Sequence, residues 1–306
     1  MASRTAVVKW LLDSDPSIRW QVLRDLTDEP DEVVAAERAR IATEGWGAQL
    51  LGLQTADGDW SDDTHQHGWM TTTDVLQLLK ELGVDPADEK VCKAVGLVTD
   101  RITWFQLDGR PFFDGETEAC INGRILGAGA YFAAACDRLL ARLLDEQLAD
   151  GGWNCEAPRS TRSSFHSTIC VLEGLLAYEN ARGPTTAATD ARLRAQEYLL
   201  ERRMLRSLAS GEVIDRRWMR FAFPPVWHYD VLRGLDYLRS AGVKPDERIA
   251  EAVSVVESRR HQNGRWPLNL LHADRTRIPL DMEIGVGTAS RWNTLRALRV
   301  LDWYGR

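Results

Sequence analysis

Hydrophobic residues recur every three or four positions in several segments that contain few charges. This pattern predicts helices that are buried on most sides. We interpret these segments as inner helices of a helical repeat. Their residue ranges are 18–26, 71–79, 120–126, 166–175, 227–235 and 290–298.

More polar segments lie between the inner ones, and each has a one-sided apolar stripe that is typical of a helix with one buried face. We expect them to form an outer layer. Their ranges are 32–49, 89–102, 131–147, 187–207 and 246–260. Alternating β-branched runs do not extend beyond a few residues, so strands are not expected. Asp15 followed by Pro16 predicts the N-cap and first turn of the first inner helix.

A short motif recurs at the turns between helices. Two copies fit the pattern Q-x3-G-x-W and a third keeps only its Gly and Trp, at Gln54, Gly58 and Trp60, at Gln147, Gly151 and Trp153, and at Gly264 and Trp266. Glycine permits a tight reversal and tryptophan packs over the neighbouring hairpin, so we interpret these tryptophans as structural. The alternating helices and the motif predict an all-α fold, an (α/α)6 toroid of about six helical hairpins, in a single domain over residues 1–306.

Composition narrows the class of protein. The chain of 306 residues is 44% hydrophobic and 27% charged, as in ordinary globular proteins. No stretch approaches the roughly 18 apolar residues of a spanning helix, and no apolar signal sequence opens the chain, so we expect no transmembrane segment and a cytoplasmic location. Five cysteines without short paired spacing are typical of a reducing compartment. The net charge of −7, without a basic run, disfavours a nucleic-acid partner.

With these repeats, the chain resembles the terpenoid cyclase and protein prenyltransferase superfamily over nearly its whole length. It is most similar to a squalene-cyclase-like protein with a single toroid. The resemblance implies a deep central cavity that is lined by the N-terminal ends of the inner helices. It also implies that the partner is a small hydrophobic, isoprenoid-like molecule.

Cyclases of this superfamily protonate an alkene with an Asp-x-Asp-Asp run at the start of an inner helix. The matching place here, residues 69–74, lacks that acid. The resemblance therefore implies an atypical cyclase or isomerase, in which proton transfer would need His228, Asp74, Asp230 or Glu118. Aromatic faces can stabilise cationic intermediates, and the candidates near the inner helix starts are Trp20, Trp69, Trp227, Tyr229 and Trp292.

Protein prenyltransferases hold zinc through an Asp, a Cys and a His. In this sequence Ser164 and His166 stand where the Asp-x-Cys pair would lie, and His228 stands at or beside the position of the His. Other soft or nitrogen ligands are available, and the candidate metal ligands are Cys120, Cys155, His166 and His228. One alternative function is thus a zinc-assisted enzyme. Another is a toroid that binds a ligand or a peptide without turnover.

Polar residues recur in the first turn of each inner segment, where free N–H groups and helix dipoles favour an anion or a polarised oxygen. The candidates for substrate binding or catalysis are Arg19, Thr72, Asp74, Asn122, Arg124, His166, His228, Asp230 and Arg291. They could equally be caps and interhelix ion pairs.

Three further features carry hypotheses. Cys120, with Glu118 nearby, is expected at a helix N-terminus, where a thiol pKa falls. Residues 62–67, with Asp62, His65 and His67, resemble a metal-binding tract. The long stretch 266–287 has no helical period, and we expect it to cover one mouth of the funnel.

Overall fold

The computed structural model describes residues 3–60, 68–273, 280 and 282–305. Within them the fold is all-α, and the one sheet is a two-stranded antiparallel pair, β1 (Thr103–Trp104) and β2 (Arg110–Pro111). The α-helices are α1 (Arg4–Leu12), α2 (Pro16–Leu26), α3 (Asp31–Ala39), α4 (Gly45–Gly52), α5 (Gly68–Leu82), α6 (Glu89–Arg101), α7 (Ala119–Tyr131), α8 (Asp137–Asp145), α9 (Phe165–Arg182), α10 (Thr186–Glu201), α11 (Val231–Ser240), α12 (Ala250–Ser258) and α13 (Arg291–Tyr304). None of these helices is long and apolar enough to cross a membrane.

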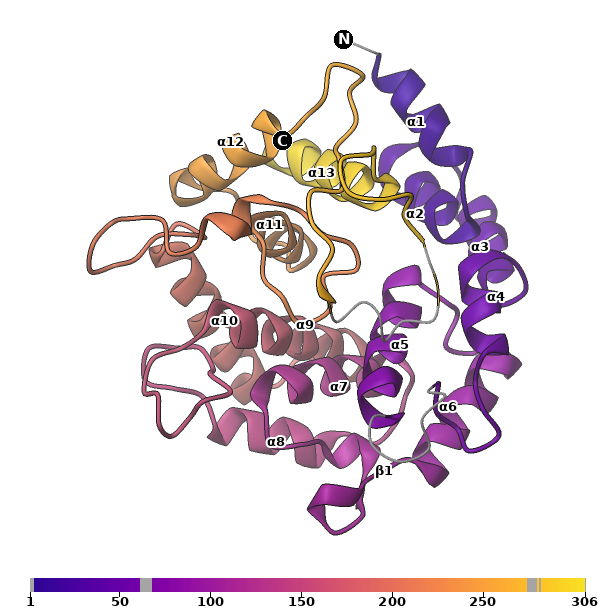
Figure 1. Cartoon of the computed structure of the whole chain (residues 1–306), viewed down its shortest axis with the longest axis vertical. Coiled ribbons are helices and arrows are strands. Elements are labelled where there is room, and N and C mark those ends of the chain that lie inside the picture. Colours follow the sequence, from indigo (N-terminus) through magenta and orange to yellow (C-terminus); the bar gives the residue numbers. More distant parts are fainter. Residues whose placement is uncertain (1–2, 61–67, 274–279, 281, 306) are drawn as a thin grey trace.

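The helices follow one another around a ring (Figure 1). Helices α2, α5, α7, α9, α11 and α13 form the inner layer, and the remaining helices lie mostly outside them. The two ends of the chain meet, because Arg4 of α1 donates to Asp302 of α13 over 2.7 Å. Arg299 of α13 also donates to Gln21 of α2 over 2.7 Å. The predicted all-α fold is therefore confirmed, and it has the closed form of a toroid.

Most predicted inner segments lie in helices, but the segment 227–235 begins too early. Helix α11 starts at Val231, and the carboxylate of Asp230 accepts the N–H of Arg233 over 2.8 Å as an N-cap. Trp227, His228 and Tyr229 thus precede the helix rather than form its first turn. Asp15 and Pro16 do begin α2 as an N-cap and first-turn pair.

Three predicted outer segments were also too long, and one of them, 187–207, passes the end of α10 at Glu201. Segment 32–49 divides into α3, a 3-10 turn over Arg40–Ala42 and α4, and a left-handed glycine, Gly45, begins the last of these. Segment 131–147 begins α8 only at Asp137, since Tyr131 is the last residue of α7. Hydrophobic period alone does not mark these interruptions.

The repeated motif has a common geometry. Each tryptophan is buried, and its indole N–H donates to the carbonyl ten residues earlier, from Trp60 to Leu50 (2.6 Å), from Trp153 to Leu143 (2.7 Å) and from Trp266 to Val256 (2.7 Å). Those carbonyls belong to the last turns of α4, α8 and α12. The indoles therefore cap outer helices, and the structural interpretation of these tryptophans is confirmed.

The glycine and glutamine of the motif complete this turn. Gly151 has φ of 97°, and a Cβ there would lie 2.7 Å from the carbonyl oxygen of Arg194. The amide of Gln147 donates to the carbonyls of Gly151 (2.6 Å) and Ala191 (2.8 Å). Because Ala191 lies in α10, the glutamine joins its own turn to the next outer helix.

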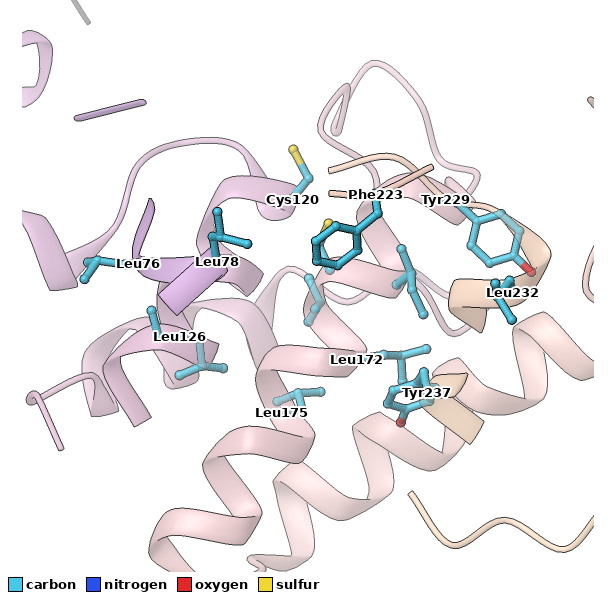
Figure 2. Packing of buried hydrophobic residues seen from close by; sticks show 14 of the residues in the cluster. Leu76, Leu78, Cys120, Leu126, Leu172, Leu175, Phe223, Tyr229, Leu232 and Tyr237 are labelled. Atoms are coloured by element: carbon cyan, nitrogen blue, oxygen red, sulfur yellow. The ribbon is translucent and has the colours of Figure 1, made fainter. Parts of the chain in front are cut away.

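Helices α7 and α9 approach each other through glycines. A Cβ on Gly174 would lie 2.3 Å from the carbonyl oxygen of Gly123, so only hydrogen fits between the two backbones. Leucine side chains from these helices pack with those of α5 and α11 in the core (Figure 2). This close approach places the first turns of α7 and α9 next to each other.

Candidate functional site

The inner helices run in parallel, so their N-termini gather at one end of the ring. The backbone N–H of Tyr229, just before α11, donates to Nδ1 of His166 in the first turn of α9 over 2.8 Å. Cys155 likewise connects the first turns of α7 and α9. Its sulfur accepts the backbone N–H of Cys120 in α7 and lies close to the hydroxyl of Ser167 in α9. The inner helices also line a cavity, from the C-terminal turns of α5 and α9 to the first turns of α11 and α13. The molecule therefore offers two candidate sites.

A thiol cluster lies at the N-terminal end. One ligand atom from each of Glu118, Cys120 and Cys155 lies within 4.8 Å of the others. The backbone N–H of Cys120 donates to Cys155 Sγ over 3.3 Å, and Ser167 Oγ lies 3.2 Å from the same sulfur. Cys155 thus sits between two helix N-termini, where a negative sulfur is stabilised.

The two thiols of this cluster titrate in opposite directions. The hydrogen bond from the Cys120 thiol lowers the pKa of Cys155, and Ser167 adds to this effect. The same interaction with Cys155, together with burial, raises the pKa of Cys120. The pKa of Cys120 is thus raised, whereas its place at a helix N-terminus predicted a lowered one, because the neighbouring Cys155 and burial both disfavour its thiolate.

A group of aromatic and imidazole rings is separate from the thiol cluster. Its members are His166, Trp227, His228 and His272. His228 stacks on His272 with ring centroids 3.6 Å apart and on Trp227 at 3.8 Å. The rings of His166 and His228 are 5.7 Å apart. Burial and the nearby His228 lower the pKa of His166 to about 4, so its imidazole is neutral at neutral pH.

The predicted metal ligands are therefore divided. Among the described residues, the group with metal-binding geometry joins Cys120 and Cys155 to Glu118 and includes neither His166 nor His228. The tract 62–67 lies outside the described residues. All five cysteines are free thiols.

Several first-turn polar residues bridge or cap neighbouring helices. Asp74 of α5 and Arg124 of α7 form a buried ion pair. The amide of Asn122 accepts the N–H of Glu116 over 2.7 Å and donates to its carbonyl over 2.9 Å. Burial raises the pKa of Asp230, the N-cap of α11, although nearby arginines oppose that effect. These contacts fit the alternative reading of such residues as caps and ion pairs.

The remaining predicted residues are more dispersed. Arg19 donates to Glu37 over 2.6 Å, and Arg291 donates to the carbonyls of Trp10 and Asp13. The Thr72 hydroxyl is buried and has no hydrogen-bond partner among the described residues. The side chain of Trp69 lies outside the described part of the chain.

The inner helices line a cavity of about 780 Å³. Its wall is formed by C-terminal residues of α5 and α9, by α11 from Arg233 onwards, by Trp292, Arg296 and Arg299 of α13, and by residues of α2 and α3. The resemblance implied a cavity at the N-terminal ends of the inner helices, and the first turns of α11 and α13 do contribute to this wall, whereas α5 and α9 contribute their C-terminal turns. Of the predicted substrate-binding residues, Trp20 and Trp292 line it, and the ring of Trp292 stacks on Phe223 at 4.3 Å.

The cavity wall is rich in charge, with seven basic and four acidic side chains. Arg233 donates to Glu173 over 2.8 and 2.7 Å, and Arg239 donates to Asp236 over 2.8 Å. Burial opposes ionisation of Glu173, but the Arg233 guanidinium outweighs it and lowers its pKa. These residues were not among the candidates from the sequence, although basic residues recurring in the second half of inner segments could have indicated the arginines.

The stretch 266–287 is described in part, since residues 274–279 and 281 lie outside the described chain. Its described residues lie at the N-terminal end of the ring, where Asn293 of α13 donates to the Pro267 carbonyl over 3.1 Å and His272 stacks on His228. Burial raises the pKa of Glu283 to about 7, although Ser290 and the N–H of Trp292 bond to its carboxylate. Sequence analysis did not single out this carboxyl group as a candidate acid.

No family model matches the sequence, and no curated protein matches it. A solved structure of a protein from Actinoplanes has 16% identity and a TM-score of 0.49, covering 99% of this chain and 100% of that chain. An apo variant of the type II terpene cyclase MstE from Scytonema has 16% identity and a TM-score of 0.48, covering 97% of this chain and 94% of that chain. Similarities at this level do not assign a function.

Proposed function

We propose that the central cavity binds a largely apolar, isoprenoid-like small molecule and that the protein is an atypical cyclase or isomerase. The observation that carries this proposal is the cavity of about 780 Å³ inside a closed helical ring, with Trp292 and Phe223 stacked in its wall. Small-molecule sites commonly have volumes of about 300 to 1,000 Å³ and aromatic linings. The motif-based resemblance to terpenoid cyclases supports the same ligand class.

The chemistry would depend on aromatic faces and a proton donor. Trp292 presents a ring that can stabilise a cation as it moves along an isoprenoid chain, whereas the guanidinium groups of Arg24 and Arg38 already lie over the ring of Trp20. Among the carboxyl groups, Glu283 has a pKa near 7 and bonds to the backbone of Trp292. A group with that pKa retains its proton near neutrality, so Glu283 is our preferred general acid, with Asp230 as the second choice.

Binding of farnesol, measured by titration calorimetry, tests the cavity proposal. Trp292→Leu should weaken binding at least tenfold, because it removes the aromatic face. Trp303→Leu is the matched control, since Trp303 does not line the cavity and bonds instead to the Val243 carbonyl. Failure of the wild type to bind farnesol, or equal binding by the Trp292 variant, would reject the proposal. Glu283→Gln should reduce turnover of a cyclisable prenyl substrate without weakening binding.

A second candidate function is zinc-assisted catalysis at the thiol cluster. Two thiolates and a carboxylate, with a fourth position open, form a donor set suited to catalytic zinc. The sulfur and carboxylate atoms of Cys120, Cys155 and Glu118 are close enough to share one ion. The exposed Glu118 makes the cluster reachable from solvent, and Ser167, with its Oγ 3.2 Å from Cys155 Sγ, would support the thiolate by a hydrogen bond. Bound zinc would act there as a Lewis acid or hold a reactive thiolate.

Elemental analysis of protein purified with added zinc and without chelators tests this second candidate. We expect about one zinc per chain, lost in Cys155→Ser and reduced in Glu118→Gln. Cys92→Ser is the matched control, because Cys92 is exposed in α6 and is not part of the cluster. Wild-type protein without zinc, or zinc retained in Cys155→Ser, would remove this candidate.

A further inference from the structure

We propose that Cys155 and Cys120 form a reversible disulfide when the protein meets hydrogen peroxide or an organic hydroperoxide. Cys155 is the thiol that reacts with the peroxide, and Cys120 is the thiol that closes the link. Neither residue lines the central cavity, so the inference does not depend on the ligand proposed for that cavity.

The two sulfur atoms are already neighbours. They lie within 4.8 Å of each other, and a disulfide bond is about 2.05 Å long. The Cys155 sulfur also lies 3.3 Å from the backbone nitrogen of Cys120, which is bonded to the Cα that carries the second thiol. A change of the Cys120 side-chain rotamer can therefore supply much of the approach without a shift of α7.

The burial of the two residues assigns their roles. Cys155 is half-buried in the segment between Trp153 and α9, whereas Cys120 is only 7% exposed. Figure 2 shows the Cys120 sulfur at the edge of the packed hydrophobic side chains, pointing away from them. A peroxide from solvent therefore meets Cys155 first, and Cys120 lies close enough to react with the oxidised sulfur.

Hydrogen-bond donors hold the Cys155 sulfur in place. It accepts the backbone N–H of Cys120 over 3.3 Å and lies 3.2 Å from the hydroxyl of Ser167. The backbone N–H of Cys155 donates to the same Ser167 hydroxyl over 3.2 Å, which fixes the residue between the first turns of α7 and α9. These donors stabilise negative charge on the sulfur as it attacks a peroxide oxygen.

The other cysteines are less suited to this reaction. Cys92 is exposed in α6, and Cys136 is buried at the start of α8. Cys170 is buried in α9, where its thiol donates to the Trp227 carbonyl over 3.6 Å and its sulfur accepts from Arg233 over 3.7 Å. Cys155 and Cys120 combine an accessible thiol with a protected neighbour.

The reaction balances with the peroxide as the oxidant. The Cys155 sulfur attacks one peroxide oxygen, so an S–O bond forms, the O–O bond breaks, and the second oxygen leaves with the thiol proton as water or an alcohol. The Cys120 sulfur then attacks the Cys155 sulfur, so the S–S bond forms, the S–O bond breaks, and the hydroxyl leaves as water. Two electrons pass from the two sulfur atoms to the peroxide, and a dithiol reductant returns them when it restores the thiols.

Glu118 provides a route for the second proton. The Cys120 thiol donates to the Glu118 carboxylate, with 3.7 Å between Sγ and Oε2. The carboxylate can accept this proton as the S–S bond forms and pass it to the departing hydroxyl. Because Glu118 is exposed, it also exchanges protons with solvent.

Mass spectrometry of the reduced, chelator-treated protein after exposure to a small excess of hydrogen peroxide tests the inference. Alkylation with N-ethylmaleimide in denaturant should label three cysteines instead of the five free thiols, and all five again after dithiothreitol. Peptide mapping without reductant should find Cys120 linked to Cys155. Five labelled cysteines, a link to Cys170 instead, or sulfinic acid at Cys155 without a link would overturn the inference.

Substitutions test the two roles separately. Cys120→Ser should leave Cys155 as a sulfenic acid that dimedone traps, whereas wild type should give little adduct because its second thiol closes the link. Cys155→Ser should abolish both the adduct and the link. Cys92→Ser is the matched control and should form the link as wild type does, since Cys92 lies outside the pair. Equal dimedone labelling of wild type and Cys120→Ser would show that Cys120 does not close the link and would refute its role.

The outcomes also separate this inference from the zinc candidate. Zinc and the disulfide use the same sulfur atoms, so one molecule cannot hold both, and the chelator removes that competition. A link in the chelator-treated protein supports the inference whether or not zinc binds to the reduced form. Zinc binding without any link after peroxide would keep the zinc candidate and overturn the inference.

Discussion

Replacing Gly174 by alanine should force α7 and α9 apart at their closest approach. The new Cβ would lie 2.3 Å from the carbonyl oxygen of Gly123 and 3.1 Å from its carbonyl carbon. Ordinary contacts between such atoms begin about 1 Å further out, and the obstacle is backbone rather than a mobile side chain. The helices must therefore shift. We expect the steric cost to lie at the upper end of the range for overpacked cores, about 3 kcal/mol.

Alanine also has a better helix propensity than glycine, by about 1 kcal/mol in a helix interior. The net expectation for Gly174→Ala is a loss of about 2 kcal/mol in the free energy of unfolding, from these two opposing terms. Gly96→Ala in α6 is the matched control, because a Cβ there has no heavy atom within 4 Å. The control should gain up to about 1 kcal/mol from propensity alone.

Urea unfolding monitored by tryptophan fluorescence, together with calorimetry, measures both variants. For a chain of 306 residues, about 2 cal/mol/K of unfolding entropy per residue makes 1 kcal/mol worth about 1.5 °C. Gly174→Ala should thus unfold about 3 °C lower and Gly96→Ala about 1.5 °C higher than wild type. If the two variants shifted stability by the same amount and sign, the claim that backbone contact fixes the α7 and α9 pair would be refuted.

Other changes probe the motif and the buried titratable groups. Trp153→Phe removes the indole hydrogen bond to the Leu143 carbonyl and leaves a void, so the free energy of unfolding should fall by about 2 kcal/mol, and a change below about 0.5 kcal/mol in urea titrations would contradict the capping role. His166 has a folded pKa of about 4, below its ordinary 6.5, so its contribution to stability is full above pH 6.5 and is lost as the pH falls towards 4. His166→Gln should therefore flatten the acid side of the stability profile, and an unchanged slope between those values would count against the burial of a neutral imidazole. Glu283 has a folded pKa of about 7, above its ordinary 4.5, so its protonated form favours the fold below pH 4.5 and this benefit is lost as the pH rises through 7. Glu283→Gln should remove that decline in melting temperatures measured from pH 4.5 to 7.5, and a decline that persists would show that another group causes it.

Local sequence determined the helices and several of their boundaries. A period of three to four residues depends only on neighbours along the chain, so the segment 166–175 could be placed in α9 without knowledge of the fold. Asp15 and Pro16 likewise act within a single turn, as N-cap and first helical residue of α2. The turn at Gly151 and Trp153 also depends on local residues. Its φ of 97° strongly favours glycine, and the indole N–H bonds to a carbonyl only ten residues away.

The candidate sites depended on tertiary structure. Cys120 lies close to Cys155 because α7 and α9 pack closely through their glycines. The sequence did not reveal which of the two sulfur atoms would accept a backbone N–H. The cavity is lined by the first turns of α11 and α13 but by the C-terminal turns of α5 and α9, and the sequence did not show this division. Arg233 donates two hydrogen bonds to Glu173, whereas Arg296 only approaches Asp236, with Nε 3.7 Å from the carboxylate, although both arginines look alike in the sequence. Helical period is set by bonds between neighbouring residues, but burial, pairing and the charge of a cavity are set by distances between residues far apart in the chain, and these exist only once the ring has closed.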